Sequence, residues 1–405
     1  MSKFDKHFRM KTSDVVEYVR EKLPACFDPE ERLQCCEIGD GNINYVFRVV
    51  GSSGKSVIVK HADEFVRSSG NAASTDRNRI EAQILKLQHS YSPSHVPEVF
   101  LYDPIMYCIV MEDVGDHENL RYALMAHKTF PTLARDIGEF MADVLVPTTD
   151  LLMGSAQKKK AVEEYINPDM CRISERLVFT EPFTNAQGSN KPFAPNEEFL
   201  NHELYQDEEL KKQAAVLKMH FECCAQALIH GDLHSGSIFV KAGSTMVLDP
   251  EFAFYGPMGY DVGNVIAHLV FAWSAAWCAM EDGAEKKNFL RWLEETMAQT
   301  WNCFRIRAFE LASESQDPVY RNAKYLNLYL DGVAADTAGY CGTEVIRRII
   351  GSAKVKDITS LQPEDVRVRA ERICILAAKR FMKQREAFTD ATAYAAVLRE
   401  EAEKV

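Results

Sequence analysis

The hydrophobic pattern of this chain changes once, near residue 114, and this change limits the folds that the chain can adopt. Before that point the apolar residues form short β-rich runs and one amphipathic helix. In that helix Ile80, Ile84 and Leu87 share one face, and Thr75 or Asp76 can cap its start. The strands are expected at residues 35–39, 43–50, 56–60, 98–101 and 108–112.

After residue 114 the apolar residues recur at helical spacing. Long helices are expected at residues 131–145, 208–226, 284–307 and 363–388, with two short strands at 238–241 and 245–248. This order predicts an α+β fold, with a small β-rich lobe at residues 1–114 and a large helical lobe at residues 115–405. A chain of 405 residues, 46% of them hydrophobic, is long enough to give each lobe a core.

Several features favour a soluble protein of the cytoplasm. The start of the chain lacks the apolar core of a signal peptide. The most apolar later segment, residues 262–280, contains Asn264, His268 and Ser274, so a buried helix is expected there rather than a membrane span. The 11 cysteines include no C-x-x-C pair, which favours reduced thiols in a reducing compartment.

The charge balance excludes general nucleic-acid binding as the expected function. The chain has 47 Lys and Arg against 59 Asp and Glu, which gives a formal net charge of −12. A net acidic chain repels the phosphate backbone of a nucleic acid. A local basic pocket for a small anionic substrate remains compatible with this composition.

A glycine-containing segment at residues 39–46 resembles the phosphate-covering loop G-x-G-x-x-G-x-V. Gly39 and Gly41 match the first two glycines, and Asn44 stands at the third. Asn is the residue other than glycine that most readily adopts left-handed backbone conformations. A strand is expected directly after this loop, whereas a dinucleotide-binding loop requires a helix. An ordinary hairpin turn would explain the same residues.

Lys60 ends the next expected strand and resembles the lysine that holds the α- and β-phosphates in the V-A-I-K strand of kinases. The order of elements, with a glycine loop, a strand, the lysine strand and then a helix, supports this interpretation. Glu81 lies on that helix and is the expected partner of Lys60. Asp76 is a weaker candidate.

The segment from Leu228 to Val240 carries the strongest catalytic motif. Asp232 lies in a polar loop of sequence His-Gly-Asp-Leu-His, between an apolar run and a β-run. A carboxylate in such a loop can orient an attacking hydroxyl group and accept its proton. As an alternative, His230 and His234 could bind a metal with Asp232 in a hydrolase, although no third His or Cys group completes a zinc site.

Two more carboxylates, Asp249 and Glu251, follow the second short strand. Their i and i+2 spacing lets both reach one hard cation, and Mg²⁺ prefers a few carboxylates together with phosphate oxygens and water. A solvated Asp-x-Glu pair is common, so the position of this pair shortly after Asp232 carries the prediction.

The run from Ile229 to Gly263 resembles the 5-methylthioribose kinases, which are related to aminoglycoside phosphotransferases and protein kinases. The matching segments include His-Gly-Asp-Leu-His-Ser-Gly-Ser and Asp-Pro-Glu-Phe-Ala-Phe-Tyr-Gly-Pro-Met-Gly-Tyr-Asp. Further matches lie at residues 37–47, 176–183 and 346–351. The resemblance spans about residues 30–385 and implies the bilobal protein-kinase-like fold.

This resemblance implies specific roles. Asn44, Lys60 and the segment Glu112, Asp113 and Val114 would contact ATP. Asp232 would be the catalytic base, Asp249 and Glu251 would hold Mg²⁺, and Arg347 and Arg348 would belong to the sugar site. The family usually has a Trp-containing loop after the lysine strand, but residues 69–74 contain no Trp. Fine substrate choice is therefore expected to differ.

The implied reaction transfers the γ-phosphate of ATP to the anomeric 1-hydroxyl of 5-methylthioribose, a step of methionine salvage. A homodimer is implied by the family alone. One alternative is a kinase for another small substrate, such as 5-deoxyribose, an aminoglycoside or choline. Cationic substrates favour carboxylates or aromatic cages, which the pair Arg347 and Arg348 argues against. A second alternative is a catalytically dead nucleotide-binding module, against which the retained Lys60, Asp232, Asp249 and Glu251 argue.

Overall fold

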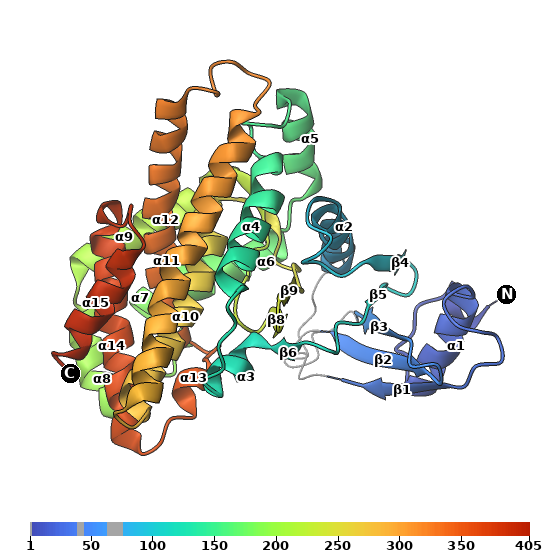
Figure 1. Cartoon of the computed structure of the whole chain (residues 1–405), viewed down its shortest axis with the longest axis horizontal. Helices are drawn as coiled ribbons and strands as arrows, with labels where there is room; N and C mark the ends of the chain where they lie inside the picture. Colours follow the sequence, from blue (N-terminus) through green and yellow to red (C-terminus); the bar gives the residue numbers. More distant parts are fainter. Residues whose placement is uncertain (1, 39–43, 63–75) are drawn as a thin grey trace. The chain divides into compact units, whose positions relative to one another are not determined.

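A computed structural model describes residues 2–38, 44–62 and 76–405 of the chain (Figure 1). The chain forms two compact units. Unit 1 comprises Met1–Asp116 and Met246–Glu251, and unit 2 comprises His117–Thr245 and Phe252–Val405. The short segment 246–251 had been expected in the helical lobe, but it packs with unit 1.

Unit 1 is built on one antiparallel sheet of five strands in the order β1-β2-β3-β5-β4. All five expected strands are present within a few residues of their expected bounds, and the helix α1 was not expected. The elements are α1 (Thr12–Lys22), β1 (Leu33–Glu37), β2 (Tyr45–Gly51), β3 (Ser56–His61), α2 (Asp76–Tyr91), β4 (Val99–Asp103) and β5 (Cys108–Glu112).

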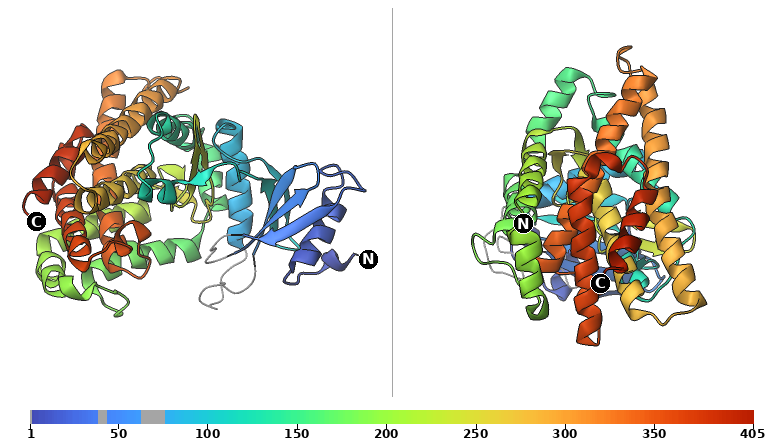
Figure 2. Two further views of the ribbon diagram at one scale, coloured as in Figure 1. Left: turned by 60° about the horizontal axis from the view of Figure 1, so that its bottom comes forward. Right: turned by 90° about the vertical axis from the view of Figure 1, so that its left-hand side faces the viewer.

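The core of unit 1 lies between the sheet and the N-terminal segment that contains α1 (Figure 2). Strands β2 and β3 pair in a register that sets Phe47 opposite Val59 and Val49 opposite Val57, and all four side chains are buried. Because successive side chains of a strand point to opposite faces, Lys60 projects from the other face of β3. The sheet thus separates a largely apolar core from a face that carries charge.

Unit 2 is mostly helical, as the apolar spacing predicts. Its strands are β6 (Glu118–Asn119), β7 (Ala227–Ile229), β8 (Ile238–Lys241) and β10 (Phe254–Gly256), and β9 (Ser244–Val247) begins in unit 2 and ends in unit 1. Its helices are α3 (Leu120–Met125), α4 (Leu133–Leu145), α5 (Ser155–Glu164), α6 (Pro168–Ser174), α7 (Glu181–Thr184), α8 (Glu197–Leu200), α9 (Glu208–Cys223), α10 (Gly259–Ala279), α11 (Ala284–Ser313), α12 (Ala323–Ile350), α13 (Lys356–Thr359), α14 (Glu364–Lys383) and α15 (Thr392–Ala402).

Helix α10 forms the centre of unit 2, with α11, α12 and α14 packed around it (Figure 1). Among the described residues it is the one helix long and apolar enough to cross a membrane, but 78% of its most apolar window is buried inside the structure. A core helix of a soluble protein has the same composition. The expectation of a buried helix at residues 262–280 is therefore confirmed.

A glycine allows α10 and α12 to approach closely. A Cβ atom at Gly263 would lie 2.7 Å from the backbone oxygen of Thr337 on α12. A larger side chain would force the two helices apart, at a cost of about 1–3 kcal/mol. This contact matters for the site, because α10 begins beside the loop of Asp232 and α12 ends with Arg347 and Arg348.

Candidate active site

The loop that carries Asp232 follows β7 and is fixed by Asp261, in the first turn of α10. The Asp261 carboxylate accepts hydrogen bonds from the backbone N–H of His230 (2.7 Å) and of Gly231 (3.0 Å). Gly231 has a φ of 82°, and a Cβ there would lie 2.3 Å from the backbone oxygen of Phe252. The loop therefore requires glycine at this position, and two helix-anchored hydrogen bonds hold its backbone.

The Asp232 carboxylate lies among positive charges within unit 2. Its Oδ1 accepts hydrogen bonds from Arg347 (2.9 Å) and Arg348 (3.1 Å), and its Oδ2 lies 3.3 Å from His234 Nε2. Burial acts to raise the pKa of Asp232, but His234 and the two guanidinium groups outweigh burial and hold this pKa well below its usual value. Asp232 is thus an ionised carboxylate at neutral pH.

The histidines of this loop do not form a metal site. His234 Nδ1 accepts a hydrogen bond from the backbone N–H of Gly236 (3.0 Å), and its Nε2 faces Asp232. Across the residues that the structure describes, no three His, Cys, Asp or Glu side chains are grouped to hold a metal. The geometry thus gives no support to the hydrolase alternative.

Arg347 and Arg348 lie in the last turn of α12, and both point to the same carboxylate. Their side chains are only 11% and 8% exposed. Glu344, one turn earlier, accepts hydrogen bonds from the Nε of both arginines. Burial acts to lower the pKa of Arg347, but Glu344 and Asp232 outweigh it and raise this pKa.

A small pocket lies beside Arg347 in unit 2. It is lined by Leu177, Glu181, Ser189, Asn190, Arg347, Gly351, Ser352 and Ala353. Leu177 and Glu181 belong to the segment 176–183 that resembles the kinase family. That segment overlaps a π-helical stretch, Glu175–Thr180, and such stretches are frequent at functional sites.

Lys60 is a buried cation that contacts two carboxylates within unit 1. Its Nζ lies 2.7 Å from Glu81 Oε1 and 2.7 Å from Asp249 Oδ1. Burial acts to lower the pKa of Lys60, but Asp249, Glu81 and Glu251 outweigh burial and raise it. Glu81, rather than Asp76, is the helix residue that pairs with Lys60.

The pair of carboxylates after β9 lies in the same unit. Asp249 has a φ of 64°, a left-handed conformation that is costly for a residue other than glycine and that clusters at functional sites. Glu251 Oε2 accepts a hydrogen bond from the Asn44 side chain (3.2 Å), and Asn44 also contacts Arg77 (3.3 Å). Asp249 and Glu251 both raise the pKa of Glu81, whose burial already raises it.

This donor set fits Mg²⁺ held together with a nucleotide. Mg²⁺ usually binds one or two carboxylates and completes its shell with phosphate oxygens and water. Asp249 and Glu251 supply two hard oxygen donors beside Lys60. A divalent cation at these carboxylates would also offset the negative charge that they impose on Glu81.

The other expected nucleotide contacts are described in part. Gly39, Gly41 and the segment 69–74 lie outside the described residues. Glu112 is the last residue of β5, and Asp113 is engaged in an ion pair with Arg48 (2.8 Å). Val114 is buried. Nothing in the structure tests whether this segment contacts ATP, so that role stays a prediction.

Sequence reasoning missed three charged groups near Asp232. Asp261 holds the loop, Glu344 holds the arginines, and Arg121 at the start of α3 is close enough to Asp232 and Arg348 to interact with their charges. The Nε of Arg121 lies 3.8 Å from the buried Asp357. Each of these residues is distant from Asp232 in sequence, so no local spacing signalled their proximity.

Comparison with known proteins gives one consistent family. The model of the phosphotransferase enzyme family matches residues 34–302. A methylthioribose kinase of Yersinia pseudotuberculosis serotype IB (strain PB1/+) is 37% identical over 367 residues, which cover 89% of this chain and 88% of that protein. A methylthioribose kinase of Pectobacterium carotovorum subsp. carotovorum (strain PC1) is also 37% identical and covers 90% and 91% of the two chains.

Among solved structures, a choline kinase from Cryptosporidium parvum Iowa II aligns over 97% of both chains, with a TM-score of 0.47 and 11% identity. An aminoglycoside phosphotransferase from Alicyclobacillus acidocaldarius aligns over 95% of this chain and 96% of that one, with a TM-score of 0.41 and 14% identity. At these values the alignments add nothing to the α+β fold described above.

Proposed function

This chain belongs to the phosphotransferase enzyme family, and we propose that it is the ATP-dependent kinase that phosphorylates the anomeric 1-hydroxyl of 5-methylthioribose. The products are the 1-phosphate and ADP, and the step belongs to methionine salvage. The chain covers most of the length of methylthioribose kinases at 37% identity, which supports this substrate. The observation that carries the chemistry is one ionised carboxylate, Asp232, held between two buried arginines.

In the proposed mechanism Asp232 orients the sugar hydroxyl and takes its proton late. A carboxylate whose pKa is held low is a weak base. Phosphoryl transfer passes through a loose transition state, in which the bond to the attacking oxygen has hardly formed when the old bond is largely broken, so the hydroxyl group has gained little acidity. Positioning of the hydroxyl group by Asp232 therefore contributes more to the rate than early proton removal does.

We propose that Arg347 and Arg348 move part of their contact from Asp232 to the phosphoryl oxygens as the reaction proceeds. The negative charge of the transferred group spreads over its equatorial oxygens, and guanidinium groups can bind two such oxygens at once. Both arginines already point at the carboxylate that would bind the nucleophile. The small pocket beside Arg347 is our candidate for the distal end of the sugar.

In unit 1, Lys60 would contact the α- and β-phosphates and Glu81 would hold it in place. Asp249 and Glu251 would hold Mg²⁺, which supplies charge neutralisation at the β- and γ-phosphates. Asn44 and the segment Glu112–Val114 would complete the nucleotide contacts. We also propose that the protein is a cytoplasmic homodimer.

A phosphorylation screen tests the proposal. The purified protein is given ATP and Mg²⁺ with 5-methylthioribose, 5-deoxyribose, ribose, choline or kanamycin, and ADP release is measured for each. We expect methylthioribose to have the highest kcat/KM, with 5-deoxyribose partly accepted because the segment 69–74 lacks a Trp. A preference for choline or kanamycin would reject methylthioribose as the substrate. No activity on any acceptor would favour the alternative of a catalytically dead nucleotide-binding module.

A further inference from the structure

Glu344 is a fully buried carboxylate on α12 that contacts both arginines of the candidate site. Its Oε1 accepts a hydrogen bond from Arg348 Nε (2.7 Å), and its Oε2 accepts one from Arg347 Nε. The spacing explains this double contact. Residues three and four positions apart on a helix are neighbours, and Glu344 is three positions before Arg347 and four before Arg348.

The arginines use different atoms for their two carboxylate partners. Each donates its Nε–H to Glu344 and a terminal Nη2 to Asp232 Oδ1. Burial acts to raise the pKa of Glu344, but Arg347 and Arg348 outweigh burial and hold it well below its usual value. Glu344 thus supplies a permanent negative charge between two cations that would otherwise repel each other.

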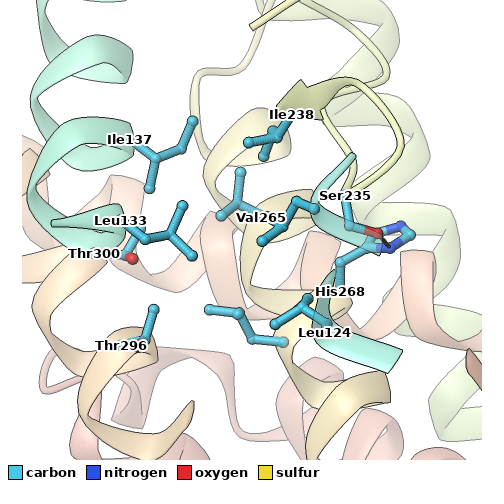
Figure 3. Close-up of a pocket in the computed structure, with 11 residues that line it drawn as sticks. Leu124, Leu133, Ile137, Ser235, Ile238, Val265, His268, Thr296 and Thr300 are labelled. Carbon is cyan, nitrogen blue, oxygen red and sulfur yellow. Dashed lines mark hydrogen bonds between the residues drawn. The ribbon is translucent and has the colours of Figure 1, made fainter. Parts of the chain in front are cut away.

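Glu344 also contacts a histidine of another helix. His268 of α10 lies 3.4 Å from Glu344 through its Nε2, and its Nδ1 lies 2.8 Å from the Ser235 hydroxyl (Figure 3). Burial lowers the pKa of His268 to about 3, so the imidazole is neutral. An ionised Glu344 requires a donor, which assigns the proton of His268 to Nε2 and leaves Nδ1 to accept from Ser235.

These contacts close a ring around the catalytic loop. Ser235 lies in the same loop as Asp232, His268 lies on α10, and Glu344 and the arginines lie on α12. The ring runs from Asp232 through the arginines to Glu344 and from there through His268 to Ser235. It therefore ties the arginines to the loop by a route that does not depend on the Asp232 carboxylate.

We propose that Glu344 is a positioning residue that keeps Arg347 and Arg348 in place when Asp232 turns to the sugar hydroxyl. This inference rests on the proposed kinase function. In the reaction Asp232 must exchange its contacts with the arginines for one with the substrate. Without Glu344 the two guanidinium groups would be free to close on Asp232, and the phosphoryl group would have to compete with that carboxylate for them.

The main experiment compares two glutamates of the same unit by steady-state kinetics. Glu344→Gln removes the charge and keeps the shape. Glu371→Gln is the matched control, because Glu371 is also buried but lies on another helix, α14. It accepts hydrogen bonds from Arg367 Nε (2.9 Å) and from Asn196 (2.9 Å). We expect Glu344→Gln to lower kcat about ten- to a hundredfold with KM for the sugar changed less than about threefold. Glu371→Gln is expected to lower the melting temperature and leave kcat within about twofold.

A double-mutant cycle distinguishes an effect of Glu344 through the arginines from a general loss of structure in the variant. If Glu344 acts through the arginines, Glu344→Gln should change kcat less than about twofold in a protein that already carries Arg347→Ala and Arg348→Ala. An equal loss in both backgrounds would overturn the inference, as would a folded Glu344→Gln variant with wild-type kcat.

A substrate-free measurement keeps the test decisive if Glu344→Gln does not fold. In ¹⁵N-labelled wild-type protein, Arg347 and Arg348 should give two Nε–H resonances that exchange slowly with water, assigned by Arg→Lys variants. His268→Gln should weaken their protection and lower kcat about three- to tenfold. Absence of protected Nε–H signals would overturn the inference. Wild-type protein that is inactive on every sugar would instead reject the proposed function, because the resonances do not depend on turnover.

Discussion

Asp232 combines a low pKa with a predicted role in accepting a proton, and its surroundings explain how both can hold. Two guanidinium groups and His234 stabilise the carboxylate, so it stays ionised over the physiological range and is ready to accept a hydrogen bond from a hydroxyl group. The anomeric hydroxyl of a sugar is more acidic than an ordinary alcohol. A weak but well-oriented base is therefore sufficient for this acceptor.

Replacing Asp232 by Asn should lower turnover by about 10² or more, the usual scale for a positioned base. Asn keeps the shape but cannot accept the proton, and it removes one of the two carboxylates that Arg347 and Arg348 contact. The lysine and the carboxylates of unit 1 are untouched, so ATP affinity should stay near normal. Turnover and ATP binding by calorimetry are the measurements, and a variant with wild-type turnover would remove Asp232 from the mechanism.

The two arginines should affect kcat more than KM. Their proposed contact is with the phosphoryl oxygens, and an interaction made mainly in the transition state appears in kcat. We expect Arg347→Ala and Arg348→Ala each to lower kcat about 10²-fold or more, a scale similar to the loss of an oxyanion donor.

Lysine at either position separates charge from geometry. Arg347→Lys and Arg348→Lys should restore only part of kcat, because a point charge cannot donate to Glu344 and to a second anion in the way that a planar guanidinium does. If both Ala variants kept full kcat, the pair would have no part in the reaction.

At the scale of the elements, the sequence predicted what depends on local pattern. The alternation of apolar residues placed all five strands of unit 1, and their helical spacing placed most long helices of unit 2. The strand β5 was predicted with its observed bounds. The helix α1 and the 28-residue helix α12 were not predicted. In α12 buried residues occur on most faces, because α10, α11 and α14 all pack against it, so its apolar residues form no single stripe.

The candidate site shows the same limit. Asp232, Asp249, Glu251 and Lys60 were identified because each stands in a motif with fixed local spacing. Glu344 and Asp261 were not, since their roles depend on how α12 and α10 are placed beside the loop of Asp232. A buried Glu in a helix has no local signature that separates a structural ion pair from one that orients catalytic groups.

The segment after β9, which carries Asp249 and Glu251, leads to a prediction about Mg²⁺ dependence. Asp249→Ala or Glu251→Ala should abolish Mg²⁺-dependent ATP turnover, because Ser237 stands where the general kinase pattern has the Asn of a second metal contact. Asp249→Ala also removes one partner of Lys60, whereas Glu251→Ala removes one partner of Asn44. Turnover measured against Mg²⁺ concentration decides, and a normal rate with normal Mg²⁺ dependence in either variant would contradict the assignment.

At the scale of the whole molecule, the predicted functional residues divide between two units with separate cores. Unit 1 holds Lys60, Glu81 and the carboxylates of the segment 246–251, and unit 2 holds Asp232 and the arginines. The segment 246–251 packs with unit 1, although its neighbours in sequence on both sides belong to unit 2. Truncation at residue 114 would therefore separate unit 1 from the carboxylates of Asp249 and Glu251.

The stability of unit 2 should fall at both ends of the pH scale. On the acid side, the pKa of Asp207 is lowered to about 2, since hydrogen bonds from Lys383, Leu210 and Lys379 outweigh the effect of burial. A lowered carboxyl pKa contributes stability above the unfolded value of about 4, and this contribution is lost as the pH falls through 2. On the alkaline side the relevant group is His220, whose pKa is raised rather than lowered on folding.

His220 offers the sharpest test of this pH dependence. A hydrogen bond to Asp336 (2.9 Å), aided by Cys224, raises the pKa of His220 to about 10. Since the folded pKa exceeds the unfolded value of about 6.5, the stabilisation is complete below pH 6.5 and is lost as the pH rises through 10. The side chain is 36% exposed, so solvent screening limits the contribution to about 1 kcal/mol, or a melting shift of about 2 °C.

His220→Gln should therefore melt below wild type at pH 6 and close to it at pH 10, while the control His202→Gln, at a 77% exposed side chain, should match wild type throughout. A difference that stayed constant between pH 6 and pH 10 would show that His220 contributes packing rather than charge.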